Sequence, residues 1–219
     1  MKSVLVTGGT VRLGRAIAER LRAEGWRVIT SSHRAAAGAD IVADLVEPMG
    51  AAKLYAAALR ILGGTPPDAL VNNAALFTGD AAAIAAVNLE APKKLTTLMA
   101  GREMGVGAVV NILDAGIRDQ GSGGRREYLD SKRELAAFTR SSAAMFAATL
   151  RVNAVAPGPV LAPTEVHVKA GATLLDRRPT AEDVAAAVSY LLGAESVTGV
   201  VIPVDAGQHL IREEGTGKR

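Results

Sequence analysis

Residues 3–14 read SVLVTGGTVRLG, an apolar run that breaks into a glycine-rich turn and continues into a helical pattern over residues 12–24. An apolar run that ends at glycine predicts a buried strand, and the glycines let the main chain approach a ligand closely. The helix would add unpaired N–H groups and the positive end of its dipole. We therefore expect a pyrophosphate-binding turn rather than a turn without a ligand. Its expected residues are Gly8, Thr10, Arg12, Leu13 and Gly14.

Short β-rich runs and longer alanine-rich helical patterns alternate along the rest of the chain. The β-rich runs are apolar throughout, which is typical of parallel strands buried on both faces. The pattern predicts an α/β fold with a doubly wound, mostly parallel, Rossmann-like sheet of about seven strands and helices on both faces. We expect a single domain over residues 1–219, with a frayed tail at about residues 212–219. The expected strands are residues 3–7, 27–31, 41–43, 69–73, 108–113, 149–156 and 199–205. Only about eight residues, 33–40, separate the second strand from the third, which predicts an abbreviated crossover. The helix between the fourth and fifth strands is expected to run to about Met99.

The composition excludes several functions. The chain has no cysteine and three histidines, His33, His167 and His209, which lie far apart and without metal-ligand spacing. We therefore expect no disulfide and no metal site, and we expect a reducing, cytoplasmic location. No run of roughly 18 apolar residues predicts a membrane span. The net charge of +3 comes from dispersed residues, which favours a small-molecule substrate and a polyphosphate cofactor over nucleic acid.

Beyond these arguments, the loop resembles the TGxxxGxG-type loop of short-chain dehydrogenases/reductases, with Arg12 at the place of the penultimate glycine. Further motifs of that family follow in order along nearly the whole chain: Asp44-Leu45, Asn72-Asn73-Ala74, Asn88, Tyr128 with Lys132, Pro157-Gly158, and VDAG at residues 204–207. The resemblance implies an NADP-binding reductase domain. It also implies that the adenine lies at Asp44 and Leu45. The nicotinamide side would be lined by Asn73, Ala74, Pro157, Gly158 and Val160.

The turn after the second expected strand indicates which nicotinamide cofactor is bound. It contains Ser32, His33 and Arg34, which donate hydrogen bonds and include a permanent cation. NAD-preferring folds generally place a carboxylate there, whereas cations suit the 2′-phosphate of NADP. We therefore expect NADPH or NADP as the cofactor. The alternative is a solvated turn in which Arg34 contacts nothing.

Tyr128 and Lys132 form a candidate catalytic pair. Their i,i+4 spacing places both on one face of an expected helix that begins near Glu127. A neighbouring ammonium would favour the phenolate and bring the pKa of Tyr128 towards neutrality, which suits a general acid. By resemblance, Lys132 also binds the cofactor ribose and Asn88 belongs to the proton relay. An isolated pair of this spacing would otherwise be an incidental feature of a surface helix.

Asp114 lies fourteen residues before Tyr128, where the family usually has serine. A carboxylate would repel a phenolate unless it holds or passes a proton, which suits a C=N bond that takes hydride at carbon and a proton at nitrogen. This feature resembles the pteridine and dihydromonapterin reductase branch, as do Arg12-Leu13-Gly14, His33-Arg34 and Phe77. The resemblance makes Arg12, Phe77, Asp114 and Tyr128 the substrate residues. Core packing is the other interpretation of Phe77.

Three hypotheses follow. The first is an NADPH-dependent reductase of a dihydropterin or dihydrofolate-like substrate, with protons passing through Asp114 and Tyr128. The second is a reductase of an ordinary ketone or quinone, and the third is an NADP(H)-binding sensor without catalysis. Residues 121–124, GSGG, and one extra residue before Tyr128 make the distance from Asp114 to Tyr128 decisive. The family's pairing of the tyrosine-bearing helix implies a homodimer or homotetramer. For His167 and Arg118, solvent exposure is favoured over substrate contact.

Overall fold

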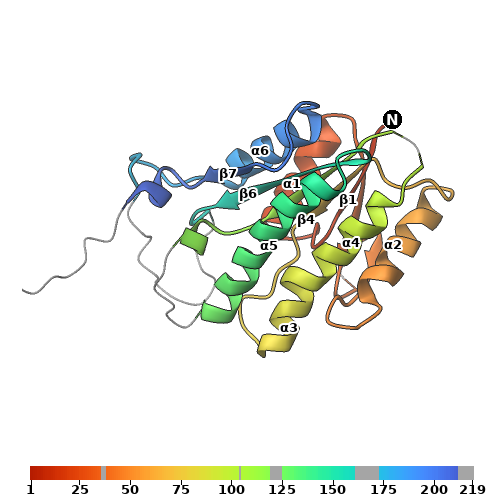
Figure 1. Ribbon diagram of the computed structural model, residues 1–219, viewed down its shortest axis with the longest axis horizontal. Helices are drawn as coiled ribbons and strands as arrows, with labels where there is room; N and C mark the ends of the chain where they lie inside the picture. The colour runs from red at the N-terminus through yellow and green to blue at the C-terminus, as the bar shows by residue number, and fades with distance from the viewer. Residues whose placement is uncertain (36–37, 104, 119–124, 161–172, 212–219) are drawn as a thin grey trace, which may run out of the picture.

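The computed structural model describes residues 1–35, 38–103, 105–118, 125–160 and 173–211. Its centre is a seven-stranded sheet in the order β3-β2-β1-β4-β5-β6-β7, and every neighbouring pair is parallel (Figure 1). The predicted doubly wound sheet is confirmed. The strands are β1 (Ser3–Val6), β2 (Arg27–Ser32), β3 (Ile41–Val42), β4 (Ala69–Asn72), β5 (Gly107–Ile112), β6 (Leu150–Pro157) and β7 (Val201–Val204).

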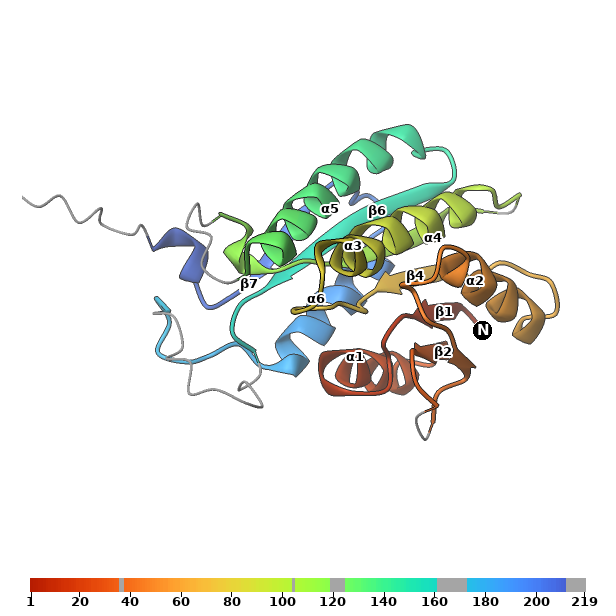
Figure 2. The same cartoon turned by 90° about the horizontal axis from the view of Figure 1, so that it is seen from below.

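Helices cover both faces of the sheet, which explains why the strands are apolar throughout (Figure 2). On one face, α1 (Arg12–Ala23) and α6 (Ala181–Gly193) pack against Val4 and Val6. On the other face, α2 (Gly50–Ile61), α4 (Ala91–Ala100) and α5 (Arg126–Met145) cover the side chains that alternate with these, such as Leu5. None of the helices in the described part of the chain is both long and apolar enough to cross a membrane.

The connection from β2 to β3 is an abbreviated crossover, as the small number of residues between these two strands predicts. Ser31 and Ser32 pair in parallel with Ile41 and Val42, and residues 33–40 make the crossover without a helix in their described part. Asp40 stabilises the entry to β3, since its carboxylate accepts hydrogen bonds from the main-chain N–H and the hydroxyl of Thr30. The abbreviated crossover is therefore confirmed.

Three local features were not predicted. Between the short helix α3 (Ala81–Ala85) and α4, the chain makes a π-helical turn, η1 (Ala86–Glu90), which contains Asn88. After β5, a 3-10 turn, η2 (Ala115–Arg118), directly follows Asp114. A further 3-10 turn, η4 (Gln208–Leu210), follows β7. The helix predicted to run to about Met99 is therefore interrupted at Asn88.

The strand order places the site. β1 lies between β2 and β4, so the chain leaves β1 in one direction and later returns to its other side. The turns after β1 and β4 therefore lead in opposite directions from the carboxyl ends of these two strands. Open α/β sheets bind ligands at such a point. The turns after β5 and β6 lie along the same edge, because all the strands are parallel.

Candidate active site

The glycine loop after β1 has the shape that a close ligand approach requires. Gly8 has a φ of +62° and lies against Ala74. At Gly14, an added β-carbon would overlap the carbonyl oxygen of Gly8, so only glycine fits there. Both positions were singled out from the sequence. The N–H of Gly9 donates to the carbonyl oxygen of Ser31 at 3.1 Å, which ties the turn to β2.

The Asn72-Asn73-Ala74 motif fixes this loop from the neighbouring strand. The Asn73 amide nitrogen donates to the carbonyl oxygens of Thr7 at 2.9 Å and Gly8 at 3.1 Å. In return, the Thr7 hydroxyl accepts from the main-chain N–H groups of Asn73 and Ala74, each at 3.0 Å. The amide of Asn73 therefore has a structural task in addition to the cofactor contact expected of it.

The amino-terminal end of α1 suits an anion. Its N-cap residue, Val11, makes no side-chain capping hydrogen bond, and the first turn contains no acidic residue. The N–H groups of this turn therefore lack a carboxylate that would compete with a phosphate. Arg12 is exposed and has a φ of +50°, the left-handed region in which its family pattern has glycine. This conformation costs about 1 kcal/mol for a residue other than glycine.

The turn after β2 presents the residues expected to bind a 2′-phosphate. His33 and Arg34 are exposed, and the Ser32 hydroxyl accepts a hydrogen bond from the main chain of Arg34 at 3.2 Å. Asp40, the first acidic residue after β2, is engaged with Thr30. These residues therefore fit a phosphorylated ribose, because no carboxylate of the described turn competes for the cation.

The remaining cofactor positions differ in what their side chains offer. Asp44 is exposed and its carboxylate accepts a hydrogen bond from Val46, whereas Leu45 is buried in the core and leaves only its main chain for a ligand. Gly158 lies against Asp205 of the VDAG motif, where an added β-carbon would come within 2.7 Å of the Asp205 side chain. Its N–H donates to Val204 at 2.9 Å. Val204 and Asp205 of the VDAG motif therefore contact the Pro157-Gly158 turn and hold it in place.

Asp114 and Tyr128 are in direct contact. The Tyr128 hydroxyl donates to Oδ2 of Asp114 at 3.0 Å, and Oδ1 accepts from the main-chain N–H of Gly116 at 2.7 Å. The extra residue between them does not separate the pair. The GSGG segment, like His167 and the expected tail, lies outside the described residues. The distance that the sequence could not supply is thus a hydrogen bond.

Lys132 lies beneath this pair. It is buried, its ammonium donates to the carbonyl oxygen of Ile112 at 2.8 Å, and its Nζ is 5.8 Å from the centre of the Tyr128 ring. Burial lowers the pKa of Lys132 to about 8, and the negative charge of Asp114 partly offsets this effect. A buried lysine with one hydrogen-bond partner has two further N–H donors, which suits the ribose contact expected of it.

The expectation that Lys132 brings the pKa of Tyr128 towards neutrality is wrong. Burial raises the pKa of Tyr128, and the charge of Asp114 and its hydrogen bond from the hydroxyl raise it further. The physical reason is that a carboxylate in contact with a phenol stabilises the protonated form. The hydroxyl of Tyr128 therefore stays protonated at neutral pH.

Asn88 makes a clamp between two segments. Its Oδ1 accepts from the N–H of Leu76 at 2.8 Å, and its Nδ2 donates to the Leu76 carbonyl at 2.9 Å and to the Ser131 hydroxyl at 3.2 Å. Ser131 in turn donates to the main-chain oxygen of Tyr128 at 2.6 Å. The side chain of Asn88 thus joins the loop after β4 to the helix that carries Tyr128.

Phe77, the next residue of that loop, covers the tyrosine. Its ring stacks on the ring of Tyr128 with centroids 4.6 Å apart and an interplanar angle of 26°. Phe77 is 57% exposed, so the interpretation as core packing is wrong. An exposed flat ring therefore lies beside the hydroxyl that donates to Asp114.

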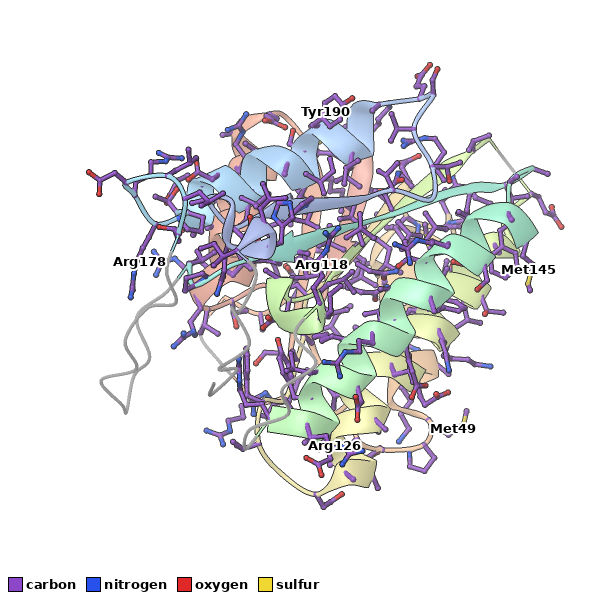
Figure 3. The ribbon with its side chains drawn as sticks, turned by 60° about the vertical axis from the view of Figure 1, so that its left-hand side comes forward. Met49, Arg118, Arg126, Met145, Arg178 and Tyr190 are labelled. Atoms are coloured by element: carbon purple, nitrogen blue, oxygen red, sulfur yellow. The ribbon has the colours of Figure 1, made fainter. Side chains whose placement is uncertain are left out.

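Two site residues were not predicted. Arg125 places Nη1 4.0 Å from Oδ2 of Asp114, the same oxygen that accepts from Tyr128. Sequence spacing gives no signal for this contact, because residues 114 and 125 share no helix or strand. Ser131 lies beside Lys132 and three residues after Tyr128, so helical spacing could have identified it. Arg118 is exposed on η2 (Figure 3), and no group of three metal-binding side chains occurs among the described residues.

The chain is similar to known reductases in sequence and in fold. Residues 65–209 match the family model described as enoyl-(acyl carrier protein) reductase. A Streptomyces violaceoruber protein, named as a ketoacyl reductase of the granaticin polyketide synthase, is 35% identical over 94% of this chain and 96% of its own length. The structure of FolM alternative dihydrofolate reductase 1 from Brucella canis, complexed with NADP, is 32% identical with a TM-score of 0.87, over 100% of this chain and 98% of that one. The Brucella suis FolM structure with NADP has 33% identity and a TM-score of 0.85, over 98% of each chain.

Proposed function

The chain belongs to the short-chain dehydrogenase/reductase family, and we propose that it is an NADPH-dependent oxidoreductase of a pteridine-type substrate, a dihydropterin or a dihydrofolate-like molecule. The observation that carries this proposal is the 3.0 Å hydrogen bond from Tyr128 to Asp114. The similarity to two FolM dihydrofolate reductase structures supports it.

The chemistry of a C=N bond explains the use of a carboxylate. When bound, the reduced nicotinamide supplies the hydride for the ring carbon. Tyr128 gives its proton to the ring nitrogen, and Asp114, whose side chain is 20% exposed, passes a replacement proton from solvent to the phenol oxygen. The raised pKa of Tyr128 keeps the donor protonated at neutral pH.

The cofactor would lie along the carboxyl edge of the sheet. The turn at Gly8 and the open end of α1 hold the pyrophosphate, and Arg34 pairs with the 2′-phosphate. Lys132 reaches the ribose through its unused N–H donors. These roles rest on family motifs together with the shape and charge of the turns.

The substrate would lie against exposed Phe77 and Tyr128. A flat heterocycle gains from stacking on an aromatic ring, and the exposed guanidinium of Arg12 would meet its polar edge. Asn88 and Ser131 hold the Phe77 loop and the tyrosine helix at a fixed separation. The hydrogen bonds of Asn88 and Ser131 therefore fix both sides of the proposed substrate site, the Phe77 loop and the helix that carries Tyr128.

A second candidate is reduction of a ketone. It is favoured by the 35% identity to the protein named as a ketoacyl reductase. In that function, Asp114 would be a local substitution for the usual serine, and Tyr128 would protonate a carbonyl oxygen. An NADP(H)-binding sensor is a weaker alternative, because a pure binder has no use for the contact between Tyr128 and Asp114.

The experiment is a substrate panel. Purified protein is mixed with NADPH and with dihydrobiopterin, dihydromonapterin, dihydrofolate or simple ketones, and NADPH oxidation is followed. We expect turnover with at least one dihydropterin or dihydrofolate. Turnover of ketones alone would contradict the proposal, and cofactor binding without turnover would favour the sensor. From the family we also infer a homodimer or homotetramer, which sedimentation of the same sample tests. We further infer a cytoplasmic location from the absence of cysteine in the sequence.

A further inference from the structure

A hollow lies outside the proposed active site. It has a volume of about 550 Å³ and lies on the α5 side of the sheet, where β7 forms the edge. This volume is within the range that small-molecule sites use. The residues that line it are Ala115, Ile117, Arg118, Arg133, Ala136, Arg140, Ala156, Gly199, Val200, Val201, Pro203 and His209.

The floor of the hollow is apolar because α5 covers β6 but leaves the edge strand open. Ala156 pairs with Pro203, and the next pair in the same register that faces this side is Ala154 with Val201. All four residues of β7 are only partly buried. On α5 the facing residue is Ala136, whose small side chain leaves room above these strands. The floor can therefore contact an apolar group.

The rim of the hollow is cationic. Arg133 and Arg140 lie on either side of Ala136 at helical spacing, and Arg118 comes from η2 (Figure 3). None of the described residues that line the hollow is acidic.

Neighbouring carboxylates neutralise part of this charge. Asp130 forms an ion pair with Arg133 at 2.6 Å, whereas Asp205 is hydrogen-bonded to Nδ1 of His209 at 2.8 Å. Within the described part of the chain, Arg118 and Arg140 make no ion pair, and both are exposed. Two arginines thus remain over an apolar floor.

We infer that this hollow binds a small amphipathic anion, with a carboxylate or phosphate held by Arg118 and Arg140 and an apolar body lying on β7. Arginine provides paired N–H donors that match the oxygens of such a group. The site is separate from the proposed active site but shares η2 with it, because Gly116 donates to Asp114 while Arg118 lines the hollow. The inference does not depend on the proposed substrate.

The test uses octanoate as the probe and isothermal titration calorimetry as the measurement. Octanoate should bind the full chain, whereas inorganic phosphate, which lacks the apolar part, and octanol, which lacks the charge, should bind at least tenfold more weakly. Arg118→Gln and Arg140→Gln should each weaken octanoate binding several-fold, and Val200→Asp, which adds a carboxylate, should abolish it. Arg22→Gln, an exposed arginine on α1, is the matched control and should bind octanoate as the wild type does.

Equal octanoate affinity in the wild type and in both arginine variants would overturn the inference, as would equal binding of octanol. Sedimentation gives a further decisive result. If Arg118→Gln and Arg140→Gln change the oligomeric state and the wild type does not bind octanoate, the hollow is a contact between copies of the chain rather than a ligand site.

Discussion

At the scale of single residues, the site depends on one oxygen atom. Oδ2 of Asp114 accepts the hydrogen bond from Tyr128 and lies 4.0 Å from the guanidinium of Arg125. Arg125 lowers the pKa of Tyr128, in opposition to burial and to Asp114. The side chain of Arg125 is 56% exposed, so solvent screens much of its charge. Arg125 therefore lowers the pKa of Tyr128 by a small amount and makes release of the tyrosine proton easier.

The first prediction concerns this cation. Arg125→Gln should lower kcat by about two- to fivefold, which corresponds to the usual worth of an exposed charge, while the Kd for NADPH stays unchanged. Arg126→Gln is the control, because Arg126 is also exposed at the start of α5 but pairs with Asp130 (Figure 3). Steady-state kinetics with the substrate identified by the panel measures both. Equal kcat values for the two variants would contradict the role given to Arg125.

The sequence predicted which residues gather here but not how they interact. The motif order and the i,i+4 spacing brought together Asp114, Tyr128 and Lys132. The contact with Arg125 and the direction of the Tyr128 pKa shift depend on burial and on distances of a few ångströms, which spacing along a chain does not contain.

At the scale of elements, the clamp made by Asn88 is the main unpredicted feature. Apolar periodicity predicted one helix to about Met99, and it cannot distinguish a π-helical turn from an α-helical one. That turn carries Asn88, whose side chain bonds both main-chain groups of Leu76 and the hydroxyl of Ser131. The loop that bears Phe77 is therefore fixed from η1 rather than by its own turn residues.

The second prediction tests this clamp by comparing two truncations. Asn88→Ala leaves the N–H and carbonyl of Leu76 without these partners and should lower the free energy of unfolding by about 2 to 3 kcal/mol. Ser131→Ala removes fewer bonds and should cost about 1 kcal/mol. Urea denaturation measures both. Asn88→Ala should also raise KM for the substrate more than KM for NADPH, because the Phe77 loop loses its support. A smaller cost for Asn88→Ala than for Ser131→Ala would contradict the clamp.

At the scale of the whole molecule, the fold followed closely from the sequence. Apolar runs that alternate with helical patterns admit few arrangements other than a parallel sheet with helices on both faces, and right-handed crossovers then restrict the strand order. The eight-residue connection after β2 was recognisable by its length alone. The hollow beside β7 was not predictable, because it forms where α5 lies over β6 and does not extend over the edge strand β7.

The third prediction concerns the stability of the whole protein against pH. Lys132 has a folded pKa of about 8, below its ordinary value of 10.5. Between these values, the unfolded chain holds a proton on Lys132 that the folded chain has lost, so stability rises with pH. Between pH 8 and 9.5 this should add about 1 to 2 kcal/mol to the free energy of unfolding. Above about pH 10 the raised pKa of Tyr128 reverses the trend, because only the unfolded tyrosine ionises there.

Denaturation of wild type and Lys132→Met at these pH values isolates the effect of Lys132. The other titrating groups are common to both proteins, so their contributions largely cancel. The rise between pH 8 and 9.5 should be present in the wild type and absent in the variant. The same rise in both proteins would show that Lys132 does not titrate in that range.

The most direct test of the proposed mechanism is the Asp114→Ser variant, which restores the residue usual in the family. With a dihydropterin as substrate, the wild type should oxidise NADPH, and Asp114→Ser should lose about a hundredfold or more in kcat, the usual worth of a positioned proton donor. The Kd for NADPH should stay within about twofold, because Asp114 contacts Tyr128 and Gly116 rather than the cofactor turns. An equal loss of turnover and cofactor affinity would contradict this account, and so would undiminished dihydropterin reduction by Asp114→Ser.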